Sequence, residues 1–120
     1  MAGKQIGELS FKITSLTFSA GPNDSVMIQV NCEGQSLGGT VALTLACTPG
    51  KSGSYTTYGT MYLDNGDIIT TKGSNGTFVS NGIHRWRTQN DITCADGIKF
   101  HTEGEMELAG RTWKGKVFEK

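Results

Sequence analysis

The chain of 120 residues lacks the sequence features that identify several classes of protein. Its 3 cysteines are widely and irregularly spaced, so we expect neither a complete disulfide framework nor a zinc-binding motif. Its 11 basic and 11 acidic residues cancel, which argues against a protein that coats nucleic acid. No apolar run has the length of a membrane span or of a signal-peptide core. We therefore expect a cytoplasmic protein with no membrane partner.

An amphipathic helix is also missing, because no segment of a dozen residues carries an apolar stripe at helical spacing. Alternation of period two is present instead, over residues 25–33 and 40–47. Such alternation is typical of strands with one buried face. A change of phase near Thr14 and Ser15 predicts a bulge in a strand over residues 8–18.

Glycine is abundant, with 17 residues, and the short turns expected between the alternating segments are rich in Gly, Asn and Asp. Asp64-Asn65-Gly66 is a strong hairpin signal, and Gly73-Ser74-Asn75-Gly76 predicts the next turn. Connections this short cannot join parallel strands, so the chain predicts eight to ten antiparallel strands. Glycines within strands, such as Gly59, Gly104 and Gly115, suit the tight bends of a small barrel.

A sheet of this many strands in so small a domain tends to close or fold over on itself. Nearly every connection is as short as a hairpin turn. The sequence therefore favours one all-β domain over residues 1–120, an up-and-down antiparallel barrel of about eight strands. A two-sheet β-sandwich is the alternative.

Two clusters carry chemistry. In a strand, His84 and Trp86 point to one side and Arg85 and Arg87 to the other. The first pair would offer an aromatic wall with a proton-transfer group, or the second pair would offer two guanidinium groups to an anionic ligand. The alternative is a structural role, with Trp86 in the core and the arginines in water or against carboxylates.

The other cluster occupies one face of a strand over residues 98–108 and consists of Lys99, His101, Glu103, Glu105 and Glu107. Inside a barrel, such carboxylates would supply a general acid or base with a raised pKa. The alternative is a solvated face that lies opposite Phe100, Met106 and Leu108, with Lys114 and Lys116 across from it. Tyr58 and Tyr62 share a strand face that suits either a pocket mouth or a subunit interface.

Leu63-Asp64-Asn65-Gly66, then Gly73, Gly76 and the segment 84–87, resemble small bacterial barrel proteins of the allene oxide cyclase-like group, which are calycin-type barrels. Residues 103–108 and Trp113-Lys114-Gly115 are similar in the same way. The resemblance covers about the last half of the chain and depends on glycine and turn spacing. It implies an often oligomeric, eight-stranded antiparallel barrel with an apolar central cavity. Characterised members cyclise or isomerise hydrophobic small molecules, but no catalytic motif matches residue by residue, so the activity is not carried over.

The leading hypothesis is a barrel that binds an apolar or amphipathic small molecule, because an eight-stranded interior holds side chains or one small ligand. A cofactor-free cyclase or isomerase is the alternative and requires an inward-facing histidine or carboxylate. A third hypothesis is an oligomeric protein-interaction module with an apolar patch outside the barrel. Whether the protein is an enzyme, or a homo-oligomer, stays open. The chain calls for no metal and no cofactor. The candidate ligand-binding residues are Tyr58, Tyr62, His84, Trp86, His101, Glu103 and Glu105.

Overall fold

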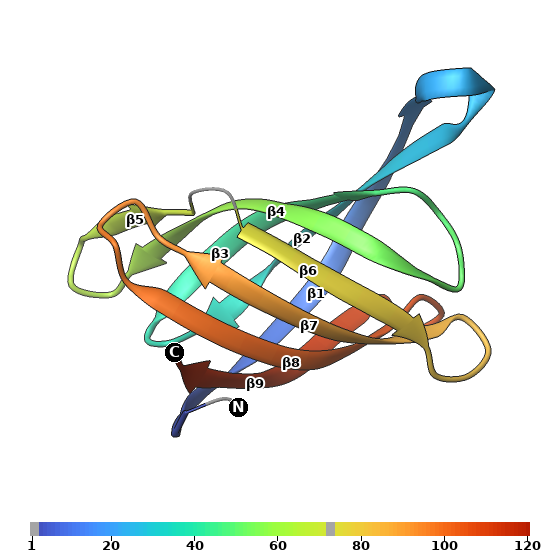
Figure 1. The fold of residues 1–120 in the computed structure, drawn as a ribbon. Helices are drawn as coiled ribbons and strands as arrows, with labels where there is room; N and C mark the ends of the chain where they lie inside the picture. The colour runs from blue at the N-terminus through green and yellow to red at the C-terminus, as the bar shows by residue number, and fades with distance from the viewer. Residues whose placement is uncertain (1–2, 72–73) are drawn as a thin grey trace.

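The computed structural model describes residues 3–71 and 74–120, and it forms a closed antiparallel barrel of eight strands with one extra strand (Figure 1). The strands are β1 (Gln5–Ala20), β2 (Val26–Ser36), β3 (Gly39–Cys47), β4 (Ser52–Leu63), β5 (Ile68–Thr70), β6 (Ser74–Ser80), β7 (Arg85–Thr93), β8 (Lys99–Glu107) and β9 (Thr112–Glu119). A short 3-10 turn, η1 (Pro22–Asp24), joins β1 to β2.

Every pairing in the sheet is antiparallel, and most neighbours are consecutive in the chain. Pairing of β1 with β9, and of β3 with β4, closes the barrel. Strand β5 pairs with the far end of β4, beyond the part that pairs with β6. The structure thus confirms the up-and-down barrel rather than the sandwich. Among the described residues, no helix has the length and apolar character to cross a membrane.

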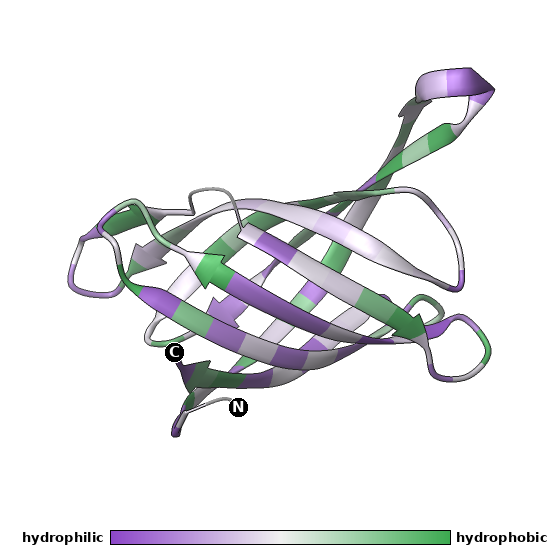
Figure 2. Cartoon of the chain, in the orientation of Figure 1, coloured by the Kyte–Doolittle hydropathy of each residue, from purple (hydrophilic) through white to green (hydrophobic). Residues whose placement is uncertain are grey.

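Hydrophilic and hydrophobic residues alternate along strands such as β8 (Figure 2). Burial alternates in the same way, with one set of side chains inside the barrel and the other in solvent. On β8, Thr102 and Met106 are buried, whereas Glu103 and Glu105 are exposed. Glu103 and Glu105 are the Cα partners of Lys116 and Lys114 on β9. The solvated reading of the glutamate cluster is therefore correct, with the lysines opposite as the sequence predicts.

The β1–β2 hairpin continues past the barrel as a projecting arm, formed by residues 14–20 of β1, η1 and the start of β2 (Figure 1). Strand β1 pairs with β9 only as far as Lys12, and β2 pairs with β3 only from Ile28 onward. A register shift between Ile13 and Ser15 marks the base of the arm and confirms the predicted bulge. The molecule measures 43 × 26 × 26 Å and is elongated.

Two local predictions need correction. Residues 74–76 lie in β6 rather than in a turn, while Gly73 falls outside the described residues. Gly76 faces inward, where a Cβ atom would come 2.6 Å from the Tyr55 hydroxyl, so its glycine makes room for packing. His84 precedes β7 with φ of 52° and does not share a strand face with Trp86. The Asp64-Asn65-Gly66 hairpin is confirmed, with Gly66 at φ 98°.

Candidate functional site

The interior of the barrel is divided near its middle by hydrogen-bonded side chains. Trp113 is 1% exposed and donates its indole N–H to Thr88 Oγ1 over 3.0 Å. Asn90 is also 1% exposed and donates from Nδ2 to Thr57 Oγ1 over 3.2 Å. Buried polar groups are stable when they pair in this way. One cavity lies on each side of this layer.

The larger cavity has a volume of about 230 Å³ and opens at the end of the barrel that carries the arm. Its wall is nearly all apolar, because the inward faces of β1, β2, β3, β6 and β8 contribute Leu, Ile, Val, Phe and Met side chains there. It is lined by Ile13, Leu16, Phe18, Ile28, Val30, Leu45, Cys47, Thr48, Pro49, Gly50, Tyr55, Phe78, Trp86, Thr88, Met106 and Leu108.

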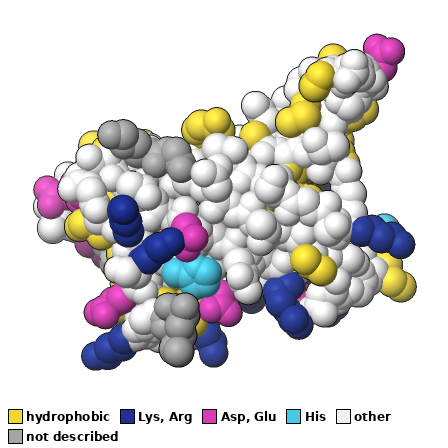
Figure 3. All heavy atoms as spheres, viewed as in Figure 1, with side chains coloured by type: hydrophobic (Ala, Val, Ile, Leu, Met, Phe, Trp, Pro, Cys, Tyr) yellow, Lys and Arg dark blue, Asp and Glu magenta, His cyan; other side chains and the backbone are white. Residues whose placement is uncertain are grey.

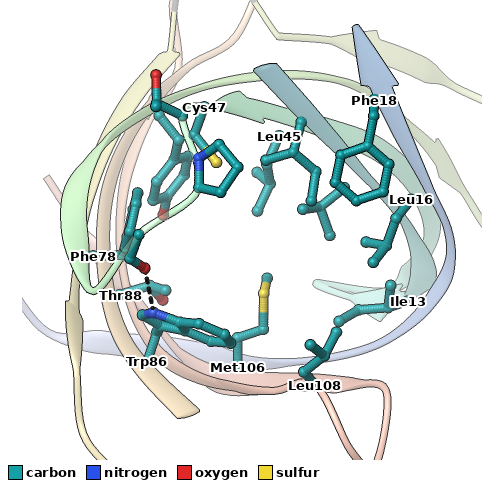
Figure 4. Close-up of a pocket in the computed structure, with 16 residues that line it drawn as sticks. Ile13, Leu16, Phe18, Leu45, Cys47, Phe78, Trp86, Thr88, Met106 and Leu108 are labelled. Carbon is teal, nitrogen blue, oxygen red and sulfur yellow. Dashed lines mark hydrogen bonds between the residues drawn. The ribbon is translucent and has the colours of Figure 1, made fainter. Parts of the chain in front are cut away.

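Figure 4 shows how these side chains surround an open centre, with Leu16 and Phe18 of the arm facing Trp86 and Phe78 across it. The indole of Trp86 is fixed in place, since its N–H donates to the Gly50 carbonyl oxygen over 3.0 Å. This bond also ties the loop before β4 to the wall of the cavity. The aromatic face of Trp86 is thereby available to an apolar molecule.

The chemistry of this cavity is that of an uncharged site. None of its lining residues is Asp, Glu, His, Lys or Arg. Burial raises the pKa of the Cys47 thiol and of the Tyr55 hydroxyl, so both are un-ionised at neutral pH. Such a wall favours apolar contact and provides no general base.

The smaller cavity, of about 60 Å³, lies on the other side of the Trp113 layer. Leu43, Phe100 and Val117 line it together with Thr57 and Thr102. The Thr102 hydroxyl is buried without a hydrogen-bond partner in the described part of the chain. A space of this size suits a few water molecules rather than an organic ligand.

Of the seven candidate residues, Trp86 alone lines either cavity. Tyr58 and Tyr62 point outward from β4 and are 58% and 49% exposed. His84 is exposed in the loop before β7. Trp86 is therefore the candidate residue that lies at a cavity, and the other six lie outside both cavities.

His101 lies on the outer face of β8 in a polar cluster. Its Nδ1 is 2.9 Å from Asp91 Oδ1, and its Nε2 is 3.4 Å from Glu103 Oε2. Lys120 Nζ is 2.9 Å from Asp91 Oδ2. Hydrogen bonds from Lys120 and then from His101 hold the pKa of Asp91 below its ordinary value. The arrangement is an ion-pair network outside the barrel and does not reach the cavity.

Glu105 belongs to a second outer network, at the start of β7. Arg85 binds Glu107 over 2.7 Å and approaches Glu105 at 3.9 Å. The Arg85 guanidinium therefore lies against carboxylates, as the structural alternative for residues 84–87 predicts. None of His84, His101, Glu103 and Glu105 has the inward position that the cyclase alternative requires.

Most cavity residues were not among the candidates, although strand parity indicates them. Tyr55 has the same parity on β4 as buried Thr57, and Leu45 the same parity on β3 as Val41 and Leu43. Parity shows which residues share a face, but which of two faces is internal follows only from closure of the sheet. In residues 3–71 and 74–120, no group of three or more His, Cys, Asp or Glu could hold a metal ion.

Comparison of the chain with protein-family models, curated proteins and solved structures found no match. The closed eight-stranded barrel is compatible with a calycin-like fold, whereas nothing in these comparisons supports kinship with allene oxide cyclases.

Proposed function

We propose that this protein binds one small uncharged apolar molecule, or the apolar body of an amphipathic one, in the larger cavity. The supporting observation is a space of about 230 Å³ with no charged side chain in its wall. Side chains that line an empty apolar space lack contacts on one side, and a ligand restores them. An apolar cavity of about 150 Å³ is already large enough to bind benzene.

The open end of the cavity decides where a polar group of the ligand would lie. Thr48, Pro49 and Gly50 are exposed there, between β3 and β4. A charged group deeper in the cavity would lose its hydration without gaining a partner, which is costly. An amphipathic ligand therefore places its apolar part against Leu45 and Met106 and its polar part at the mouth.

Binding is favoured over catalysis because the cavity offers no acid–base pair. Cys47 and Tyr55 are the titratable groups of its wall, and burial raises the pKa of each. A cyclase or isomerase that works by proton transfer needs a group that titrates near the operating pH. The resemblance to allene oxide cyclases thus adds the idea of a hydrophobic ligand and no catalytic step.

The experiment is a titration of the ¹⁵N-labelled protein with naphthalene, monitored by the two indole N–H signals in NMR spectra. Trp86 lines the larger cavity and Trp113 lines the smaller one, so the two signals report on different spaces. We expect a saturable shift that is larger for Trp86 than for Trp113. Absence of a saturable shift at Trp86 would refute the proposal.

A pair of variants locates the binding. Leu45→Trp fills part of the cavity, while Ala42→Trp adds the same side chain at an exposed position of the same strand. Leu45→Trp should weaken naphthalene binding at least about tenfold, by direct occupation of the space. Ala42→Trp should bind as the natural chain does. Equal affinities for the two variants would place the ligand elsewhere.

A further inference from the structure

The arm carries almost no charge, a property that it shares with β3 and β4. Between Ile13 and Cys32, Asp24 at the tip is the single charged residue. In the space-filling view, hydrophobic side chains lie along the arm, and an acidic side chain lies only at its tip (Figure 3). The outer wall of β8, by contrast, carries a charge at almost every outward position. Depletion of charge is characteristic of the buried centre of a protein interface.

The arm is also amphipathic, with one face that is wholly apolar. Phe18 is the Cα partner of Ile28, and Ala20 that of Val26. Phe18 is 60% exposed and Val26 50% exposed. The opposite face is polar except for Met27, and there Asn31 donates to Ser15 Oγ over 2.9 Å. A two-stranded ribbon that stands alone in water is marginally stable, so pairing with further strands would stabilise the arm.

The arm has one long free edge, along β1. Beyond Lys12, the last backbone hydrogen bond from β1 toward β9 in the described chain runs from the Ile13 N–H to the Arg111 carbonyl oxygen. Residues 14–20 then continue with no described strand on that side and contain no lysine, glutamate or proline. Natural edge strands usually carry such residues because they prevent pairing with another chain.

We propose that the arm is a dimerisation element, in which residues 14–20 of β1 pair antiparallel with the same residues of a second copy. Antiparallel pairing of identical strands has two-fold symmetry, so it closes at two subunits. The result is a four-stranded sheet with one continuous apolar face. This proposal does not depend on what the barrel cavity binds.

Charge supports a second copy as the occupant. With the two-fold axis at Thr17, the tip of each arm lies beside the base of the other arm. Asp24 of one copy then approaches Lys12 and Arg111 of the other, two exposed cations with no ion pair among the described residues. An anionic lipid surface would instead repel Asp24.

The first test is sedimentation velocity over a range of protein concentrations. The natural chain should sediment as a dimer. Thr17→Lys/Ser19→Lys places like charges on the free edge and should raise the dimer dissociation constant at least about tenfold. Thr77→Lys/Val79→Lys is the control, because these exposed positions have the same spacing on a strand that is paired on both sides. Far-UV circular dichroism checks that both variants fold.

A charge exchange tests the register. Asp24→Arg and Arg111→Asp should each weaken the dimer about two- to fivefold, and the double variant should restore it. A natural chain that stays monomeric would overturn the proposal, including a monomer that binds phosphatidylserine vesicles or another protein. Dimerisation that survives the edge lysines, or a charge exchange without rescue, would overturn the arm pairing described here.

Discussion

The Trp113 indole reaches from β9 over the intervening strand β8 to Thr88 on β7. The position that it crosses is Gly104, where a Cβ atom would lie 2.9 Å from Trp113 Nε1 and 3.2 Å from Thr88 Oγ1. Gly104 in turn is the Cα partner of both Thr88 and Gly115. A glycine inside a strand thus allows the bond that separates the two cavities.

Thr88→Val should lower the free energy of unfolding by about 1–3 kcal/mol, because it leaves the Trp113 N–H buried without an acceptor. Valine has nearly the same shape as threonine, so little packing changes. Thr77→Val, at an exposed position of β6, is the matched control and should change stability by less than about 0.5 kcal/mol. Urea unfolding measures both. Equal changes in unfolding free energy for the two variants would mean that the Trp113–Thr88 hydrogen bond does not stabilise the fold.

Gly104→Ala should cost about 1–3 kcal/mol of unfolding free energy, since the new methyl group forces Trp113 away from Thr88. The Trp113 indole N–H signal should move as its hydrogen bond is lost. Gly50→Ala is the control, because a Cβ atom there has only the Ser52 carbonyl oxygen, at 3.8 Å, nearby. An unchanged indole signal in Gly104→Ala would contradict this account of the glycine.

Naphthalene should protect Cys47 from iodoacetamide, because Cys47 lines the larger cavity. Burial raises the pKa of the Cys47 thiol above 9.0, so its alkylation rate should rise about tenfold per pH unit from pH 7 to 9. Burial raises the pKa of Cys32, which lines neither cavity, to about 12, and this thiol should react far more slowly. Peptide mass spectrometry resolves the two sites. An alkylation rate of Cys47 that is the same with and without naphthalene would argue against binding in the larger cavity.

Asp91→Asn should remove a small stabilisation that depends on pH. The folded pKa of Asp91 lies below its ordinary value of 3.8 because of Lys120 and His101. Its contribution is therefore present above pH 3.8 and is lost as the pH falls through the folded pKa. The carboxylate side chain is 56% exposed, so the effect at pH 7 should stay under about 1 kcal/mol.

The comparison is urea unfolding at pH 7 and at about pH 2.5, with Asp64→Asn in the β4–β5 turn as the control. The difference between Asp91→Asn and the natural chain should become smaller at the lower pH. A difference of the same size at both values would show that hydrogen bonding unrelated to charge is responsible.

Several features could be predicted because they are local. Period-two alternation marked the strands, and the phase change at Thr14 marked the bulge at the base of the arm. Asp64-Asn65-Gly66 marked a hairpin, since its backbone needs a residue at positive φ. Parity also placed Glu103 and Glu105 on one face of a strand, opposite Met106, but it did not decide which of the two faces is internal.

Other features depend on contacts between residues that are distant in the sequence. Gly76 looks like part of a turn, but its role is to leave space for Tyr55 of another strand. His84 looks like a strand residue, but it lies in a loop with φ of 52°. Neither local sequence pattern indicates the contacts with distant residues that determine where Gly76 and His84 lie.

The sequence by itself determined that the chain is antiparallel β-structure with short turns, because alternation and turn residues act within a few positions. Only the tertiary structure decided that the sheet closes through the β1–β9 and β3–β4 pairings, and which face is internal. It also decided that β1 and β2 extend beyond their neighbouring strands and form the arm. Closure and strand overhang are differences in length and register between distant segments. The basic and acidic residues that cancel over the whole chain are thereby localised: β7, β8 and β9 carry many of them, and the arm and the larger cavity are almost without them.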